Sequence, residues 1–439
     1  MRPLSACGAS LLSVVALKFA VGCSSNSAAP SAEASVDAGA ADGGGSSKIA
    51  AQSFEEFAPW ASPIDDYLAV GRKHQPGKFN ASINELMAAG DRLFFGYGDA
   101  DYNLGEKIPI EMRAFRSADD PASVEAVVVL GDGQGAPQKT PRQSGEEQID
   151  RYRMLDGELW QAGIDSTDPD ELWTQENTTP KGIQGNVYRL EGETFKKHRT
   201  VNGGEHVHDL ASYKGAIYSV GSGADFRTEF EAGQVFRYLW RSNDRGQSFQ
   251  TVTRVQVTTP GEGDTRFIHL LPTSGPLFAF GYESVYSSGR LIVKNISFDG
   301  TAVTELGAGH PLQKILPRGT LPLPDGTGVL WGTVAGRETF ARVAPDGALT
   351  PVTALSGLAV VDVSLTGTSE VLVLTAASVP GAKPAAWNVR LFVADLASLE
   401  AATELVQLTL DVAPTAIAHF KNALFLGVGD GRIFKAGRR

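Results

Sequence analysis

The feature that most constrains this fold is a repeat of two glycines, six positions apart, that enclose a short apolar or aromatic segment. A short run of strand-forming residues precedes each first glycine, which predicts a hairpin with its tight turn at that glycine. The second glycine marks a place where the backbone turns or is approached closely by another segment. Clear copies begin at Gly90, Gly157, Gly215, Gly275 and Gly326, and weaker copies begin at Gly367 and Asn422.

Most units continue into a second hairpin, as in NVYRLEGETFKKHRT and FARVAPDGALTPVTAL, so each unit contains four short strands. Successive units begin 41 to 67 residues apart, a period typical of propeller blades that carry loop insertions. The sequence therefore predicts an all-β chain folded as a single β-propeller with seven blades, each a four-stranded meander. Six blades remain if the divergent unit at Gly367 is not a blade. A two-sheet sandwich is the rival, but it does not easily hold seven copies of one meander.

The two ends of the repeat array are predicted to close the ring. The last unit stops after GRIFKAG, about one strand short of a full blade. The segment Phe54–Val70 precedes the first inner strand, and it is expected to supply the missing outer strand so that no sheet edge stays open. The expected divisions are a signal peptide at 1–22, a tether at 23–48 and the propeller at 49–439.

The first residues read as an export signal. Arg2 is followed by an apolar stretch that is too short for a stable membrane span. Ala20–Cys23 resembles a bacterial lipobox, which implies that Cys23 is lipidated and becomes the mature N-terminus. Ser24 in the next position resembles outer-membrane sorting in a Gram-negative bacterium. The alternative is an ordinary secretory signal that leaves a free cysteine.

Composition limits the partners of such a chain. Residues 24–48 contain almost no large apolar side chain, so we expect a flexible tether between the anchor and the folded domain. The net charge is -11, and no cluster of Lys and Arg appears, which excludes a nucleic-acid-binding surface. The expected partners are the membrane, through the lipid anchor, and an envelope protein or a glycan.

The stretch WRSNDRGQSF contains Ser242, Asp244, Gly246 and Phe249 at the spacing of an Asp box. It resembles the hairpin turn found in sialidases and other β-propellers with BNR-like repeats. The resemblance implies a turn stabilised by its own serine and aspartate, with the aromatic ring packed beneath it. It implies architecture only, because no spacing rule selects the arginine triad and catalytic groups of a sialidase.

The stretch GEHVHDLASYKG contains the most notable polar group. Strand alternation places His206 and His208 on one face, with Asp209 opposite or at the rim, and two such imidazoles can share a metal such as Zn²⁺. The first strand of each blade lines the central channel of a propeller. A ring of channel residues is therefore predicted, which either binds a cation or forms a hydrogen-bonded ring that fixes the blades. Its members are Asp150, His208, His269, Asp362 and His419.

A second candidate metal site lies in GDADYNLGEK. Asp99, Asp101 and Asn103 alternate oxygen ligands in a manner that suits Ca²⁺. The glycine of this loop is one residue later than an EF-hand requires, and no helices are predicted to flank it. Plain turn chemistry of Asp and Asn is the alternative.

Three stretches, GYGDADYN, EEQIDRYRMLDGELWQAGID and EHVHDLASYKGAIYSVGSG, together resemble a group of uncharacterised secreted bacterial β-propeller proteins. The resemblance implies no catalytic residue. A binding or scaffold module at the cell envelope is therefore predicted. The alternative is a carbohydrate-active enzyme, either a sialidase-like hydrolase or a lyase, that uses residues of the channel. Aromatic side chains that follow the second strands, either as ligand contacts or as packing between blades, are Tyr97, Tyr102, Trp160, Trp173, Phe226, Tyr282 and Tyr286.

Overall fold

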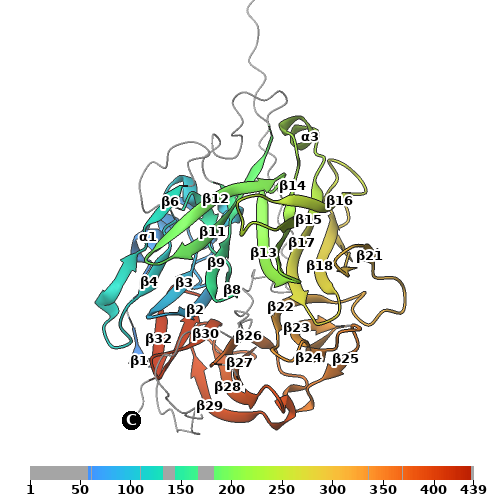
Figure 1. The fold of residues 1–439 in the computed structure, drawn as a ribbon. Helices are drawn as coiled ribbons and strands as arrows, with labels where there is room; N and C mark the ends of the chain where they lie inside the picture. Colours follow the sequence, from blue (N-terminus) through green and yellow to red (C-terminus); the bar gives the residue numbers. More distant parts are fainter. Residues whose placement is uncertain are drawn as a thin grey trace, which may run out of the picture.

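The computed structural model describes residues 58–60, 62–108, 110–131, 144–166, 182–334, 336–367 and 369–436. These residues form seven small sheets arranged in a ring (Figure 1). The prediction of a seven-bladed β-propeller is confirmed, and the unit at Gly367 is a blade of its own. Each blade is built on four antiparallel strands that run outward from the centre of the ring.

The first four blades hold the strands that follow. From the innermost strand outward, blade 1 contains β2 (Glu85–Ala89), β3 (Arg92–Gly96), β4 (Arg113–Phe115) and β5 (Val124–Ala126), and blade 2 contains β8 (Tyr152–Leu155), β9 (Glu158–Ala162), β11 (Gln184–Glu191), β12 (Thr194–Asn202) and the parallel β6 (Val129–Gly131). Blade 3 contains β13 (His206–Tyr213), β14 (Ala216–Gly223), β15 (Phe236–Ser242) and β16 (Gln250–Gln256), and β10 (Ile164–Ser166) and β7 (Glu146–Gln148) extend its sheet beside β13. Blade 4 contains β17 (Gly263–Pro272), β18 (Leu277–Val285), β20 (Ile296–Phe298) and β21 (Val303–Glu305), and β19 (Arg290–Val293) also pairs with β18.

The last three blades are more regular. They are β22 (Leu316–Pro322), β23 (Gly328–Val334), β24 (Arg337–Val343) and β25 (Leu349–Pro351) in blade 5; β26 (Val360–Leu365), β27 (Glu370–Ser378), β28 (Trp387–Asp395) and β29 (Thr403–Leu410) in blade 6; and β30 (Pro414–Phe420), β31 (Ala423–Val428), β32 (Ile433–Ala436) and β1 (Ala58–Pro59) in blade 7.

Blade 7 joins the two ends of the ring. Strand β1 pairs with β32, with Ala58 opposite Lys435, so the N-terminal segment supplies the outer strand as predicted. Only two described residues of that segment form the strand, and the chain then forms α1 (Asp65–His74), which the sequence reading did not anticipate. Acidic residues in the first turn of α1 and basic residues in its last turn complement the helix dipole.

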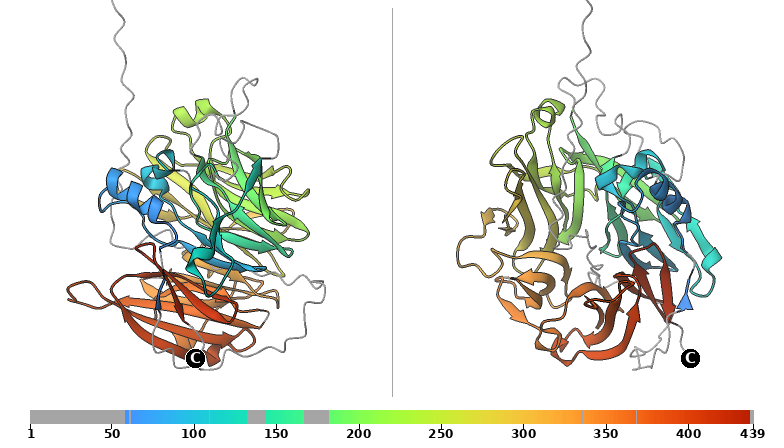
Figure 2. Two further views of the ribbon diagram at one scale, coloured as in Figure 1. Left: turned by 90° about the vertical axis from the view of Figure 1, so that its left-hand side faces the viewer. Right: turned by 180° about the vertical axis from the view of Figure 1, so that it is seen from behind.

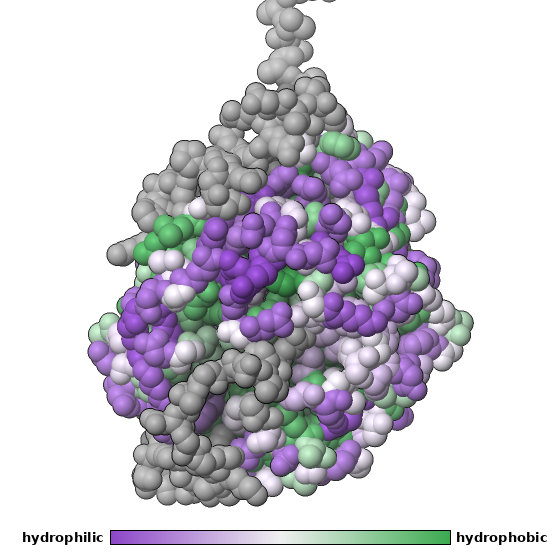
Figure 3. Space-filling model, in the orientation of Figure 1, coloured by the Kyte–Doolittle hydropathy of each residue, from purple (hydrophilic) through white to green (hydrophobic). Residues whose placement is uncertain are grey.

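Helix α1 lies on the face of the ring that is turned away from the viewer in Figure 1, and aromatic contacts hold it there (Figure 2). It buries Tyr67 and Leu68, and the Tyr67 ring lies 5.5 Å from that of Tyr97. Among the described residues, no helix is long and apolar enough to span a membrane. The visible face in Figure 3 is mainly hydrophilic, and its hydrophobic residues form small separate patches.

The apolar core lies between neighbouring blades. Blades 1 and 2, for example, pack Phe94 against Tyr152 and Phe195. This packing shows which of the aromatic side chains singled out in the sequence are buried between blades and which are exposed. Tyr97 and Trp160 are fully buried between blades, Tyr102 and Tyr282 are half-buried, Phe226 and Tyr286 are exposed, and Trp173 lies outside the described residues.

The seven innermost strands run in the same direction along the axis of the ring, and the space that they enclose is the central channel. We call the face at which these strands begin the mouth face. The opposite face, which carries the first hairpin turns at residues such as Gly90 and Gly215, is the turn face. Gly215 has a φ of 74°, as the turn prediction requires.

Candidate functional site

The innermost strands of five blades share an irregularity on the mouth-face side. In β13 the pairing with β14 slips between Val207 and Asp209, which makes a β-bulge at His208. The pairings of β17, β22, β26 and β30 slip at the equivalent position. Glycine spacing in the sequence gives no signal of these bulges. The residues that directly follow them share one level of the channel and are Asp209, His269, Gly319, Asp362 and Ala416.

Asp209 is the centre of a buried charge network. Its carboxylate accepts hydrogen bonds from Nε of Arg153 at 2.8 Å and from a terminal nitrogen of Arg153 at 2.9 Å. It also accepts the backbone N–H groups of Leu210 and Leu270, at 2.9 and 2.8 Å. Asp209, in blade 3, therefore ties blade 2 to blade 4.

Similar hydrogen bonds cross other joints between blades. In each, a side chain of one innermost strand bonds to the backbone of the next blade, so the bonds fix the spacing of the ring. They join Glu85 to the N–H of Tyr152, Asp362 to the N–H of Ile417, Thr320 to the carbonyl of Leu270 and Thr415 to the carbonyl of Ile83.

The two imidazoles of β13 lie together. The rings of His206 and His208 are stacked with their centroids 5.8 Å apart and 10° between their planes. Burial, together with the positive charge of Arg266, lowers the pKa of His208 well below its usual range, so His208 is neutral. Asp209 does not join them as a metal ligand, because the guanidinium of Arg153 and two backbone N–H groups occupy its oxygens. Across the described part of the chain, no group of three or more His, Cys, Asp or Glu side chains is arranged to hold a metal.

His269 and Arg151 complete the site from blades 4 and 2. Burial and the charge of Arg151 lower the pKa of His269 well below its usual range. Its ring bonds to the backbone of Pro317, and Nδ1 has no partner. Arg151 reaches past blade 3 and donates to the carbonyl of Ile268 at 2.8 Å, so its guanidinium joins blade 2 to blade 4. Nε of Arg151 and Nε2 of His208 also have no partner.

The mouth-face ends of β17 and β18 carry a cluster of polar and aromatic side chains. Arg266 donates from Nε to Asp264 at 2.8 Å, and its guanidinium lies 5.9 Å from the ring centre of Tyr282. Tyr286, at the end of the same hairpin, is 48% exposed. His206 lies near this cluster, since its charge acts on Asp264.

The predicted ring of five channel residues does not form as one level. His419 pairs with Leu424 near the turn of its hairpin, so it lies toward the turn face, and Ala416 takes the position equivalent to Asp362. Asp150 precedes β8 and accepts hydrogen bonds from Gln148 and Asn84. His419 was included only because it lies in the first strand of its unit, and it stands three residues before the turn at Asn422, whereas Asp209 stands six residues before Gly215.

The carboxyl group of Asp362 predicts a pH dependence of the protein's stability. Burial raises the pKa of Asp362 from 3.8 to about 7. A raised folded-state pKa contributes stability that is fully present below about pH 4 and is lost as pH rises through about 7. Asp362→Asn has no such carboxyl group and should not lose this stability. The free energy of unfolding of the variant minus that of wild type should therefore rise by a few kcal/mol between about pH 4 and about pH 8. Urea titrations of both proteins at the two pH values measure this difference, and a constant difference would contradict the assignment.

The candidate calcium loop is organised by its own backbone. Asp99 is buried and caps the short helix η1 (Ala100–Tyr102) by accepting the N–H of Tyr102 at 3.2 Å. It also accepts the N–H of Asn80. Asp101 and Asn103 are exposed. This geometry is that of turn chemistry, and the calcium site stays a prediction.

The turn between β15 and β16 has the contacts of a self-stabilised hairpin. Oγ of Ser242 bonds to Asp244 at 2.8 Å and accepts the N–H of Gly246 at 2.8 Å. Asp244 also accepts the N–H of Ser248 at 2.9 Å, and Phe249 is buried beneath. These residues stabilise a turn, and they do not form a site together with the channel histidines. Cys23 lies outside the described residues.

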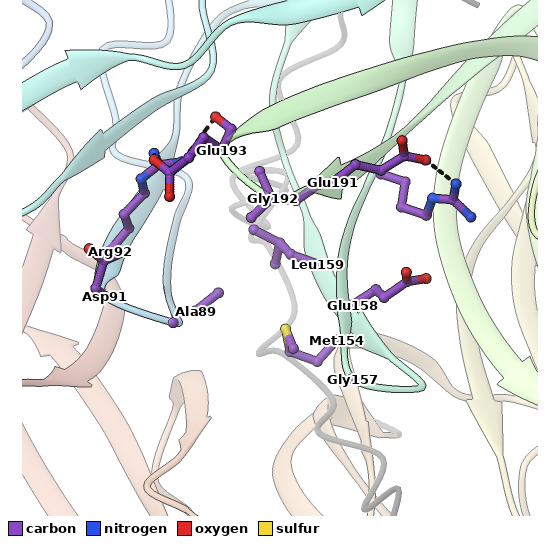
Figure 4. Close-up of a pocket in the computed structure, with 13 residues that line it drawn as sticks. Ala89, Asp91, Arg92, Met154, Gly157, Glu158, Leu159, Glu191, Gly192 and Glu193 are labelled. Carbon is purple, nitrogen blue, oxygen red and sulfur yellow. Dashed lines mark hydrogen bonds and ion pairs between the residues drawn. The ribbon is translucent and has the colours of Figure 1, made fainter. Parts of the chain in front are cut away.

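A separate open cavity of about 690 Å³ lies on the turn face, between the hairpin turns of blades 1 and 2 (Figure 4). Its charged side chains are already paired, Arg92 with Glu193 and Arg189 with Glu191. Its two arginines are thus neutralised by carboxylates, whereas the unpartnered nitrogens of Arg151, His208 and His269 lie on the innermost strands.

The chain matches no protein-family profile and no curated protein. Among solved structures it is similar to virginiamycin B lyase from Staphylococcus aureus, at 12% identity, covering 82% of this chain and 95% of that chain with a TM-score of 0.40. It is also similar to an ulvan lyase (10%, 81% and 94%, TM-score 0.43) and to a gluconolactonase from Xanthomonas campestris (11%, 64% and 78%, TM-score 0.33). These likenesses agree with the propeller fold and carry no argument about activity.

Proposed function

We propose that this protein is a lipid-anchored binding module of the cell envelope, and that its ligand binds at the mouth-face side of the central channel. One observation carries the proposal. Nε of Arg151, Nε2 of His208 and Nδ1 of His269 are buried without a partner, while Asp209 and Asp362 bond across the joints between blades. An unpaired buried polar atom costs about 1–3 kcal/mol, so three around one channel favour a site that a ligand completes.

The proposed cellular location of the module rests on the sequence. The lipobox-like Ala20–Cys23 and the tether that follows support an anchored, exported protein, and the outer membrane is the proposed destination. The Asp-box-like turn is proposed as an architectural element. An envelope glycan or protein is the proposed partner class, and nucleic acid is excluded by the charge of the chain.

Binding of small probes to the protein from Lys48 onward tests the proposal. Ligand-observed NMR with glucuronate, glucose, inorganic phosphate, Zn²⁺ and Ca²⁺ would compare wild type with the double variant His208→Gln/His269→Gln. We expect at least one probe to bind wild type and to bind the double variant about tenfold or more weakly, because two hydrogen bonds are lost. A panel without any binding, or binding that both proteins share equally, would contradict a channel site.

A second candidate, the carbohydrate-active enzyme, is favoured by one observation. His208 and His269 each have a ring nitrogen without a partner, and imidazole is the side chain that most often transfers protons in catalysis. The same spectra separate the two functions. A sugar that is converted by wild type and not by the double variant establishes the enzyme, whereas a sugar that binds unchanged supports the binding module.

A further inference from the structure

We infer that the channel site takes a small carboxylate-bearing polyhydroxy compound, such as a uronic acid, with its carboxylate against Arg151 and its hydroxyl groups donating to His208 and His269. The inference rests on the proposed function and names the ligand class for the same site. It follows from the geometry of three side chains that come from blades 2, 3 and 4.

The first step is the incomplete pairing of Arg151. This side chain is 6% exposed, and its guanidinium reaches the carbonyl of Ile268 and stands 3.3 Å from Asp209. Asp209 is already bound on both oxygens by the fork of Arg153 and by two backbone N–H groups. Two buried guanidinium groups thus share the carboxylate of Asp209, and Nε of Arg151 keeps an N–H without an acceptor. A ligand carboxylate supplies both the counter-charge and the acceptor.

The second step is the role of the imidazoles. The ring of His269 uses one nitrogen for the backbone of Pro317, whose only polar group there is a carbonyl acceptor, so that nitrogen carries the proton. Nδ1 of His269 is then a buried acceptor without a donor. A ligand hydroxyl is the donor that fits, and the neutral His208 provides a second contact at Nε2.

The third step concerns the charge of the ligand. Burial keeps both imidazoles neutral, and the charges of Arg266 and Arg151 at His208 and of Arg151 and Arg153 at His269 add to this effect. While the buried carboxyl groups Asp150 and Asp362 are protonated, the arginines favour an anion over a metal ion or an amine. Tyr282 and Tyr286 at the mouth face offer flat rings of the kind that pack against sugars.

The fourth step concerns pH, which follows from the carboxyl groups that face the site. Asp150 has its pKa raised to about 6 and Asp362 to about 7, both by burial, and burial also raises that of Glu85 well above its usual range. Asp209 and Asp264 are held by arginines, and both histidines stay neutral. As pH rises from about 5.5 to about 8, Asp150 and Asp362 ionise, so the channel becomes more negative and an anion should bind more weakly.

Titration calorimetry with glucuronate and with glucose, at about pH 5.5 and about pH 8, tests the inference. We expect glucuronate to bind wild type at least about tenfold more tightly than glucose at the lower pH, and to weaken several-fold at the higher pH. Arg151→Met should remove the preference for glucuronate, and His208→Gln should weaken both sugars. His74→Gln, on the exposed end of α1, is the matched control and should change nothing.

The outcomes distinguish a wrong ligand class from a wrong proposed function. Glucose that binds as well as glucuronate, or glucuronate that keeps its preference in a folded Arg151→Met, overturns the ligand class while the channel site stands. If none of the probes binds to wild type, the proposed function itself is overturned. Urea unfolding of each variant verifies that it is folded, and Arg151→Gln, which removes the charge and keeps a hydrogen-bond donor, replaces Arg151→Met if that variant does not fold.

Discussion

Asp209→Ala should destabilise the protein by about 3–5 kcal/mol, the largest effect of any single carboxylate removed from the channel. The substitution takes away the carboxylate that Arg153, which is 2% exposed, binds with two of its nitrogens. It also leaves the backbone N–H groups of Leu210 and Leu270 without their acceptor. The joints that tie blade 3 to blades 2 and 4 are therefore lost together.

Urea unfolding followed by tryptophan fluorescence measures this loss. The matched control is Asp65→Ala, at an exposed position in the first turn of α1, which should cost no more than about 1 kcal/mol. Asp209→Asn keeps the shape of the side chain and should fall between the two. A destabilisation by Asp209→Ala as small as that of Asp65→Ala would show that the network does not hold the blades.

Gly221→Ala should destabilise the protein by more than about 3 kcal/mol, because the second glycine of the repeat has no room for a side chain. A Cβ atom there would lie closer than 3.0 Å to the carbonyl oxygen of His206, on the neighbouring strand. That oxygen belongs to a backbone paired within the sheet, so it cannot move aside without breaking the pairing. Gly281 meets the carbonyl of Arg266 in the same way, which explains why the repeat keeps glycine at this place.

Gly307→Ala is the control for this prediction. No atom lies within 4 Å of a Cβ built at Gly307, and its φ is not in the left-handed region. Alanine there should leave stability unchanged within about 0.5 kcal/mol or raise it slightly, since it reduces the freedom of the unfolded chain. Thermal unfolding of both variants gives the comparison, and equal midpoints would contradict the close approach at Gly221.

Much of the fold was predictable because the repeat is local. The hairpin glycines set where each blade turns, and the missing strand after GRIFKAG predicted closure by the N-terminal segment. Strand alternation also placed His206 and His208 on one side of β13. Helix α1 was missed because its ten residues carry a weak apolar pattern and depend on packing by Tyr67 and Leu68.

The site was less predictable because it depends on contacts between blades. Nothing near Arg151 in the sequence indicates that its side chain passes blade 3 and reaches Ile268, which lies 117 residues later. The bulge at His208 changes the alternation at Asp209, so the residue expected as a metal ligand instead binds Arg153. The sequence pattern indicated which residues line the channel, and only the packed ring shows which of their atoms are free.

The most direct test of the channel site is a crystal structure of the domain from Lys48 onward, soaked with glucuronate at about pH 5.5. We predict density for the sugar between the innermost strands of blades 2, 3 and 4, with its carboxylate on Arg151 and hydroxyl groups on Nε2 of His208 and Nδ1 of His269. Ordered water alone on these three nitrogens, with glucuronate absent or bound on another surface, would contradict the account.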